Sequence, residues 1–168
     1  EIKHPVVRAA AEEISLDESA SAWQQVESIY DWTIQRVEHA GTKPLKGALE
    51  ALSSGIGDFE ERTSLFVAMC RLKGIPARSV WIERHTYPEF YLEDQAGNGY
   101  WFPCQSLGAR SFGEITHYQL LWQKGDHFRM AQKRAPQRYV TPTLSCTLGA
   151  GSAEPVLNEI REMTPLDG

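Results

Sequence analysis

One segment, residues 57–78, constrains the fold of this chain more than any other. Asp58 and Glu61 have the spacing of a capping box, in which each side chain accepts a hydrogen bond from the other residue's backbone amide at a helix start. Four apolar side chains then recur at helical spacing: Leu65, Phe66, Met69 and Cys70. Gly74 and Pro76 follow, and both residue types commonly mark the end of a helix. The segment therefore predicts a capped helix with one buried face that begins at Asp58 and ends at Gly74.

Helical patterns lie upstream of this segment and strand patterns lie downstream. Helices are expected over residues 5–14, from about residue 20 to 37, and over residues 46–52. Strands rich in β-branched and aromatic residues are expected over residues 77–83, 86–92 and 100–104, and the turn at 94–99 makes the last two an antiparallel hairpin. Two further strands (residues 117–123 and 138–143) and a terminal helix (residues 155–162) complete the prediction. This order indicates an α+β domain with N-terminal helices packed on an antiparallel β-sheet.

Composition limits the function classes. The 168 residues, 42% of them hydrophobic and 23% charged, predict one globular domain over residues 1–168. A net charge of −5 argues against a nucleic-acid partner. We expect no membrane insertion, because no apolar run approaches the roughly 20 residues that a spanning helix needs. The three cysteines are too few and too scattered to form a disulfide framework.

Three motifs carry a family resemblance. Residues 57–71, followed by Gly74-Ile75-Pro76-Ala77-Arg78, resemble the nucleophile segment of the transglutaminase-like superfamily, which has a papain-like cysteine-proteinase fold. Residues 85–92 are similar to that family's histidine strand, usually His-x-Trp-x-Glu-Val-Tyr-Leu. Residues 101–106 are similar to its third block, usually Trp-x-Pro-x-Asp. The resemblance implies a transglutaminase-like fold and places Phe59, His85 and Gln105 at the three catalytic positions.

Those three positions depart from the chemistry that the family uses. A thiol in the first turn of a helix is favoured as thiolate, a neighbouring histidine accepts its proton, and a carboxylate orients the imidazole. Phe59 stands at the nucleophile position and cannot attack a carbonyl. Gln105 stands at the carboxylate position and cannot balance an imidazolium charge. Only His85 remains, with Tyr87 in place of the usual tryptophan, so the sequence indicates a catalytically degenerate member.

Substitute nucleophiles are not expected. Cys70 lies about three turns, or roughly 16 Å, along the helix from Phe59 and is interpreted as a core residue. Cys104 neighbours Gln105 on a strand, so its side chain points to the opposite face. Cys146 lies outside all three motifs, and Thr63 and Ser64 lie a turn inside the helix, where hydroxyls usually bond backbone carbonyls.

Acid–base and metal chemistry are also weakly indicated. Asp58, Glu60 and Glu61 beside His85 could act as acids or bases, but acidic residues at a helix start are usually caps. The remaining candidate ligands, Glu89, His117 and His127, show with His85 none of the short spacings typical of metal sites. We expect neither a metal nor another cofactor.

The leading functional hypothesis is a non-catalytic module that binds a peptide or protein. Its predicted cleft consists of Asp58, Phe59, Tyr87, Glu89 and Trp101. The main alternative is a hydrolase or acyltransferase that uses His85 with a non-standard nucleophile. A third interpretation is a structural domain of a larger bacterial protein. No pattern in the sequence points to a compartment or an oligomeric state.

Overall fold

The computed structural model describes residues 1–41, 46–115, 120–131 and 133–140, and the single positions 147, 149, 151, 153, 156, 158 and 160. Its helices are α1 (Pro5–Glu13), α2 (Ala22–Arg36), α3 (Ala48–Ser54) and α4 (Phe59–Leu72). Its strands are β1 (Glu38–His39), β2 (Ile56–Gly57), β3 (Ala77–Ile82), β4 (His85–Glu93), β5 (Gly99–Pro103) and β6 (Leu121–Lys124). Among the described residues, no helix has the length and apolar character that crossing a membrane requires.

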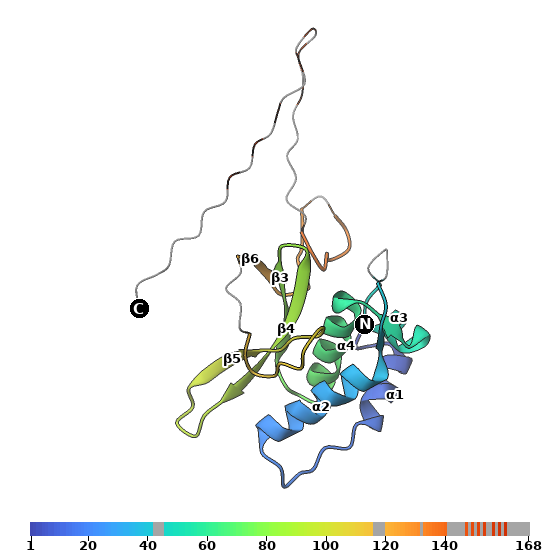
Figure 1. Cartoon of the computed structure of the whole chain (residues 1–168), viewed down its shortest axis with the longest axis vertical. Coiled ribbons are helices and arrows are strands. Elements are labelled where there is room, and N and C mark those ends of the chain that lie inside the picture. The colour runs from blue at the N-terminus through green and yellow to red at the C-terminus, as the bar shows by residue number, and fades with distance from the viewer. Residues whose placement is uncertain are drawn as a thin grey trace.

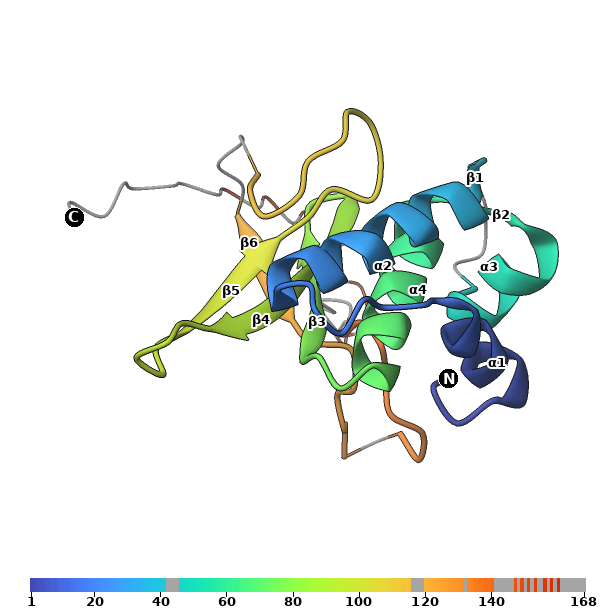
Figure 2. The same ribbon diagram turned by 90° about the horizontal axis from the view of Figure 1, so that it is seen from below.

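Four of the strands form an antiparallel sheet in the order β5-β4-β3-β6, while β1 and β2 form a short parallel pair. Helix α4 packs on β3 and β4, and α2 and α3 pack on α4 (Figures 1 and 2). The largest fully buried side chains include Phe66 of α4 and Phe90 of β4, whose rings meet edge to face. The core therefore surrounds α4 and includes side chains of the sheet and of α1, α2 and α3. The predicted α+β class is confirmed.

Local signals explain where the helices begin and end. Ser21 forms a capping box with Gln24 at the start of α2, and Asp58 forms one with Glu61 at the start of α4. Gly74, just after α4, has φ = +80°, a left-handed conformation that costs glycine little. The predicted hairpin is also present, because β4 and β5 pair in antiparallel register from Glu89↔Pro103 to Glu93↔Gly99.

The chain after β6 runs along α4. Arg71, in the last turn of α4, forms a bidentate ion pair with Asp126, in which Nη1 donates to Oδ2 (2.8 Å) and Nη2 donates to Oδ1 (3.0 Å). Arg138 forms an ion pair with Glu60 in the first turn of the same helix. The ring of Tyr139 lies 4.9 Å from that of Trp81 on β3. These contacts hold the segment to both ends of α4.

Two strand predictions need correction. Within the predicted strand 117–123, the observed strand is β6, at Leu121–Lys124, and residues 116–119 lie outside the described residues. The prediction of a strand at 138–143 is wrong for residues 138–140, which have no strand structure. The amide of Val140 donates to the side chain of Gln123 (3.0 Å) and not to a neighbouring strand, because the side-chain amide imitates a backbone partner. Residues 141–143, Cys146 and the predicted helix at 155–162, apart from isolated positions, are outside the described part.

Candidate functional site

The start of α4 supplies the first of the three motif positions. The side chain of Asp58 accepts from the amide of Phe59 (2.8 Å) and from the amide of Glu61. The side chain of Glu61 accepts in return from the amide of Asp58 (2.9 Å). In a cysteine enzyme, free amides at this helix start can stabilise an oxyanion. Here the cap already occupies two of them.

His85 and Gln105 meet beside this helix start. His85 is the first residue of β4, and Gln105 follows β5, so the antiparallel pairing of the two strands brings them together. The Nε2 atom of His85 lies 3.3 Å from Oε1 of Gln105. In this orientation of the Gln105 side chain, the amide oxygen accepts a hydrogen bond from the imidazole form that carries a proton on Nε2.

Burial disfavours the protonated form of the His85 imidazole. Desolvation lowers the pKa of His85 below its ordinary value of 6.5, and it outweighs the opposing effects of the Gln105 hydrogen bond and the Asp58 charge. Gln105 carries no charge that could stabilise the imidazolium form. The pair can therefore hold a neutral imidazole in place, but it gives little support to a protonated one.

Phe59 occupies the space beside His85. Its ring centroid lies 4.8 Å from that of the imidazole, with an interplanar angle of 65°, which is edge-to-face packing. Both side chains are half-buried. The structure thus places Phe59, His85 and Gln105 next to one another, and a hydrocarbon ring lies at the position that the sequence resemblance assigns to a nucleophile.

Three other predicted cleft residues, Tyr87, Glu89 and Trp101, share one face of the sheet but do not all reach solvent. Tyr87 is 8% exposed and packs in a small cluster with Val80, Ile82 and Ile115; its burial raises the pKa of its hydroxyl to about 12. Glu89 is 5% exposed and forms ion pairs with Arg78 and Lys124. Trp101, on β5, is 37% exposed. Asp58 is half-buried, so Asp58, Phe59 and Trp101 are the members of this set that solvent reaches.

Glu89 joins three strands of the sheet. It forms ion pairs with Arg78 of β3 (2.6 Å) and Lys124 of β6 (3.3 Å). The guanidinium of Arg78 also lies 3.8 Å from the centre of the Trp101 ring, in cation–π geometry. The chain of contacts from Lys124 to Trp101 therefore runs across the face that carries His85.

Neither described cysteine is suited to attack. Cys70 and Cys104 are both fully buried. Desolvation raises the pKa of the Cys70 thiol well above its ordinary value, and it raises that of Cys104 to about 12. The neighbouring hydroxyls are also occupied: Ser106 donates to the carbonyl of Phe59 (3.2 Å), and Thr63 lies 3.1 Å from Ser106 and 3.3 Å from the carbonyl of Thr86.

The carboxylates at the helix start have structural partners. Glu60 is 1% exposed and accepts from Arg138 and from Ser64, while its Oε2 atom has no partner among the described residues. Burial raises the pKa of Glu60. Glu61 accepts from the amides of Lys46 and Asp58. In the part of the chain that the structure describes, no group of three or more His, Cys, Asp or Glu side chains could hold a metal ion.

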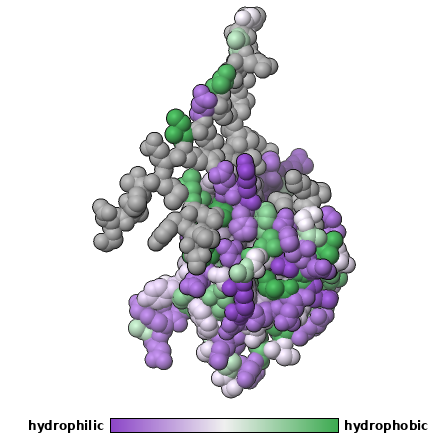
Figure 3. Space-filling model, viewed as in Figure 1, coloured by the Kyte–Doolittle hydropathy of each residue, from purple (hydrophilic) through white to green (hydrophobic). Residues whose placement is uncertain are grey.

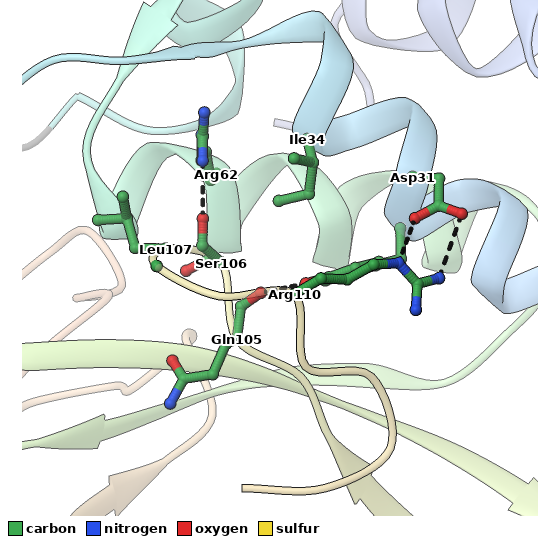
Figure 4. Close-up of a pocket in the computed structure, with 9 residues that line it drawn as sticks. Asp31, Ile34, Arg62, Gln105, Ser106, Leu107 and Arg110 are labelled. Carbon is green, nitrogen blue, oxygen red and sulfur yellow. Dashed lines mark hydrogen bonds and ion pairs between the residues drawn. The ribbon is translucent and has the colours of Figure 1, made fainter.

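The sequence reasoning missed a second feature, a small pocket next to this site. It has a volume of about 100 Å³ and lies between α2, α4 and the loop after β5 (Figure 4). Arg62 and Arg110 both line it, as does the backbone next to Gln105. The sequence contained one indication of this pocket. Arg62 lies on the same helical face as Phe66 and Met69, which is the predicted buried face, and a charged side chain is unusual there.

Comparisons with known proteins identify a family and two similar solved structures. A model of the transglutaminase-like superfamily matches residues 8–106. A candidate cysteine protease from Cytophaga hutchinsonii is similar at 22% identity and a TM-score of 0.47, over 60% of this chain and 36% of that one. A candidate protease from Parabacteroides distasonis is similar at 15% identity and a TM-score of 0.44, over 56% of this chain and 22% of that one. Because this chain spans so little of either protein, they carry no argument about its activity.

No functionally curated protein matches the chain. The family match nevertheless covers more than half of the sequence, and the three residues that the sequence resemblance places at catalytic positions lie together in space. The chain belongs to the transglutaminase-like superfamily.

Proposed function

We propose that this domain is a catalytically degenerate member of its superfamily that binds a peptide or protein without cysteine-based acyl transfer. The observation that carries the proposal is the position of Phe59. Its ring packs edge to face on His85 at 4.8 Å, where the reaction needs a thiolate. A benzyl side chain can neither attack a carbonyl nor exchange a proton with the imidazole.

Three further observations support the loss of activity. The amides of Phe59 and Glu61 are used by the cap, so they are not free to bind an oxyanion. Gln105 replaces a carboxylate, which removes the charge that stabilises an imidazolium. The two described thiols are buried and have raised pKa values.

A binding role is supported by the side chains that remain accessible. Trp101 is partly exposed and is held in place by Arg78, so it offers an aromatic surface at little cost in side-chain entropy. Phe59 adds a half-buried ring at the helix start. Hydrophobic side chains on the face shown in Figure 3 are interspersed with hydrophilic ones, which suits a partner recognised by both kinds of contact.

The test is incubation of the purified chain with amide donors and with a peptide library. We expect no turnover, and binding of selected peptides that weakens in Trp101→Ala. Turnover that disappears in His85→Ala but persists in the matched control His127→Ala, an exposed histidine elsewhere, would refute the non-catalytic proposal. Failure of every peptide to bind would refute the binding role.

A further inference from the structure

Arg62 is a buried cation that has no carboxylate partner among the described residues. Only 9% of its surface is exposed. Its Nε and Nη2 atoms both donate to the carbonyl of Val37 (3.0 and 2.6 Å), and Nη1 donates to the carbonyl of Ser106 (3.0 Å). Burial lowers the pKa of Arg62, and the charge interaction with Tyr30 opposes this effect only in part. Burying a charge in this way is costly unless it is paired.

The carbonyls account for only part of the guanidinium. Val37 is the C-cap of α2, so its carbonyl belongs to the negative end of that helix and balances some of the charge. A guanidinium has five N–H groups, and the three hydrogen bonds leave two of them without an acceptor among the described residues. Because Arg62 lines the pocket, it can offer a donor to a molecule bound there.

A second arginine stands at the other end of the pocket. Arg110 donates from Nε and Nη2 to Asp31 (3.0 and 3.2 Å) and from Nη2 to Glu27 (2.6 Å). Its Nη1 atom has no hydrogen-bond partner among the described residues. Figure 4 shows Arg62 and Ser106 on one side and the Arg110–Asp31 pair on the other, with Ile34 between them.

The charge and size of the pocket limit the chemical classes of ligand that can bind in it. Its lining includes two arginines and one aspartate, but Arg110 is paired with Asp31 and with Glu27. Arg62 is therefore the lining cation that has no carboxylate partner among the described residues. A guanidinium fork matches the planar geometry of a carboxylate. Only half of the charge of a dianion such as phosphate would be balanced by one unpaired cation, and the dianion would lie near the carboxylate of Asp31. The volume of about 100 Å³ suits a carboxylate with a short stem.

We propose that the pocket between α2, α4 and the loop after β5 binds a small carboxylate group. Arg62 contacts this group, and Arg110 lines the opposite end of the pocket. This inference deepens the proposed binding function, on which its biological meaning rests, by naming the chemistry that is recognised. The carboxylate has two sources, the C-terminus of a peptide or a free small acid.

The experiment uses the full chain labelled with ¹⁵N and follows the backbone amides of Ser106 and Gly108, which line the pocket. Sodium acetate is titrated at constant ionic strength, with acetamide as the uncharged match. We expect saturable shifts with acetate and none with acetamide. In Arg62→Gln the affinity for acetate should fall about tenfold or more, since a charge-assisted hydrogen bond is lost.

A second variant covers the case in which Arg62→Gln fails to fold. Ile34→Trp fills the pocket from α2 and should abolish the acetate shifts, whereas Ile56→Trp, at a 43% exposed position on β2, should leave them unchanged. Equal shifts with acetamide and acetate, or wild-type binding in Ile34→Trp, would overturn the proposal.

The source of the carboxylate is decided with N-acetyl-tetraalanine and its C-terminal amide. Shifts with the free acid and none with the amide identify a peptide C-terminus. Shifts with acetate but with neither peptide identify a free small acid, and both results support carboxylate recognition. A His85-dependent turnover would refute the proposed function without changing the acetate shifts, so the two failures are distinguishable.

Discussion

Replacing Phe59 by alanine tests directly whether this ring covers His85. A fully buried phenylalanine costs about 3–5 kcal/mol when it is truncated to alanine. Phe59 is only half-buried, so about half of that range applies, and the edge-to-face contact with His85 is included in it. We therefore expect Phe59→Ala to lower the free energy of unfolding by about 2 kcal/mol, measured by urea denaturation.

The sharper readout is the titration of His85. Its pKa lies below 6.5 mainly because of burial, so admitting water in Phe59→Ala should raise the pKa toward 6.5. The measurement is an NMR titration of the imidazole, with the signal assigned by its loss in His85→Gln. Phe59→Leu keeps an apolar cover and should change the pKa less.

The same shift has a consequence for stability. Because the pKa of His85 is depressed in the folded state, the unfolded chain takes up its proton first as the pH falls. The contribution of His85 to stability is therefore present above about pH 6.5 and is lost as the pH falls through the lower pKa of the folded state. This loss should be smaller in Phe59→Ala. An unchanged His85 pKa in the alanine variant would show that Phe59 does not cover the imidazole.

Two further predictions concern the start of α4. Phe59→Cys combined with Gln105→Asp should increase alkylation by iodoacetamide above that of the Gln105→Asp single variant, because an orienting carboxylate and a thiol are both restored; equal rates would mean that the rest of the site no longer supports a thiolate. Glu60 has a raised pKa, so its burial destabilises the folded state increasingly as the pH rises through that pKa. Glu60→Gln should remove this pH dependence of the free energy of unfolding, measured by denaturation from about pH 4 to about pH 8. Arg138 keeps its ion pair with Glu1 in this variant. A pH dependence equal to that of the wild type would contradict the raised pKa of Glu60.

The elements around the site could be read from the sequence because their signals are local. The Asp58–Glu61 capping box, Gly74 and the turn before β5 each depend on residues a few positions apart. The predicted strand at 138–143 was wrong over the described residues 138–140, because β-type residues do not ensure a partner strand. There, the side chain of Gln123 occupies the amide of Val140.

The sequence by itself determined the α+β class and the family resemblance, and it predicts Phe59 at the position of the nucleophile. Only the tertiary structure decided which of the predicted cleft residues solvent reaches. Tyr87 packs in a cluster with Ile115, and Glu89 forms ion pairs with two cations. The alternation of residues along a strand predicts which face a side chain lies on, but not which other residues cover that face. The pocket at Arg62 likewise arises where α2, α4 and the loop after β5 converge, and contacts between such distant segments leave no local pattern in the sequence.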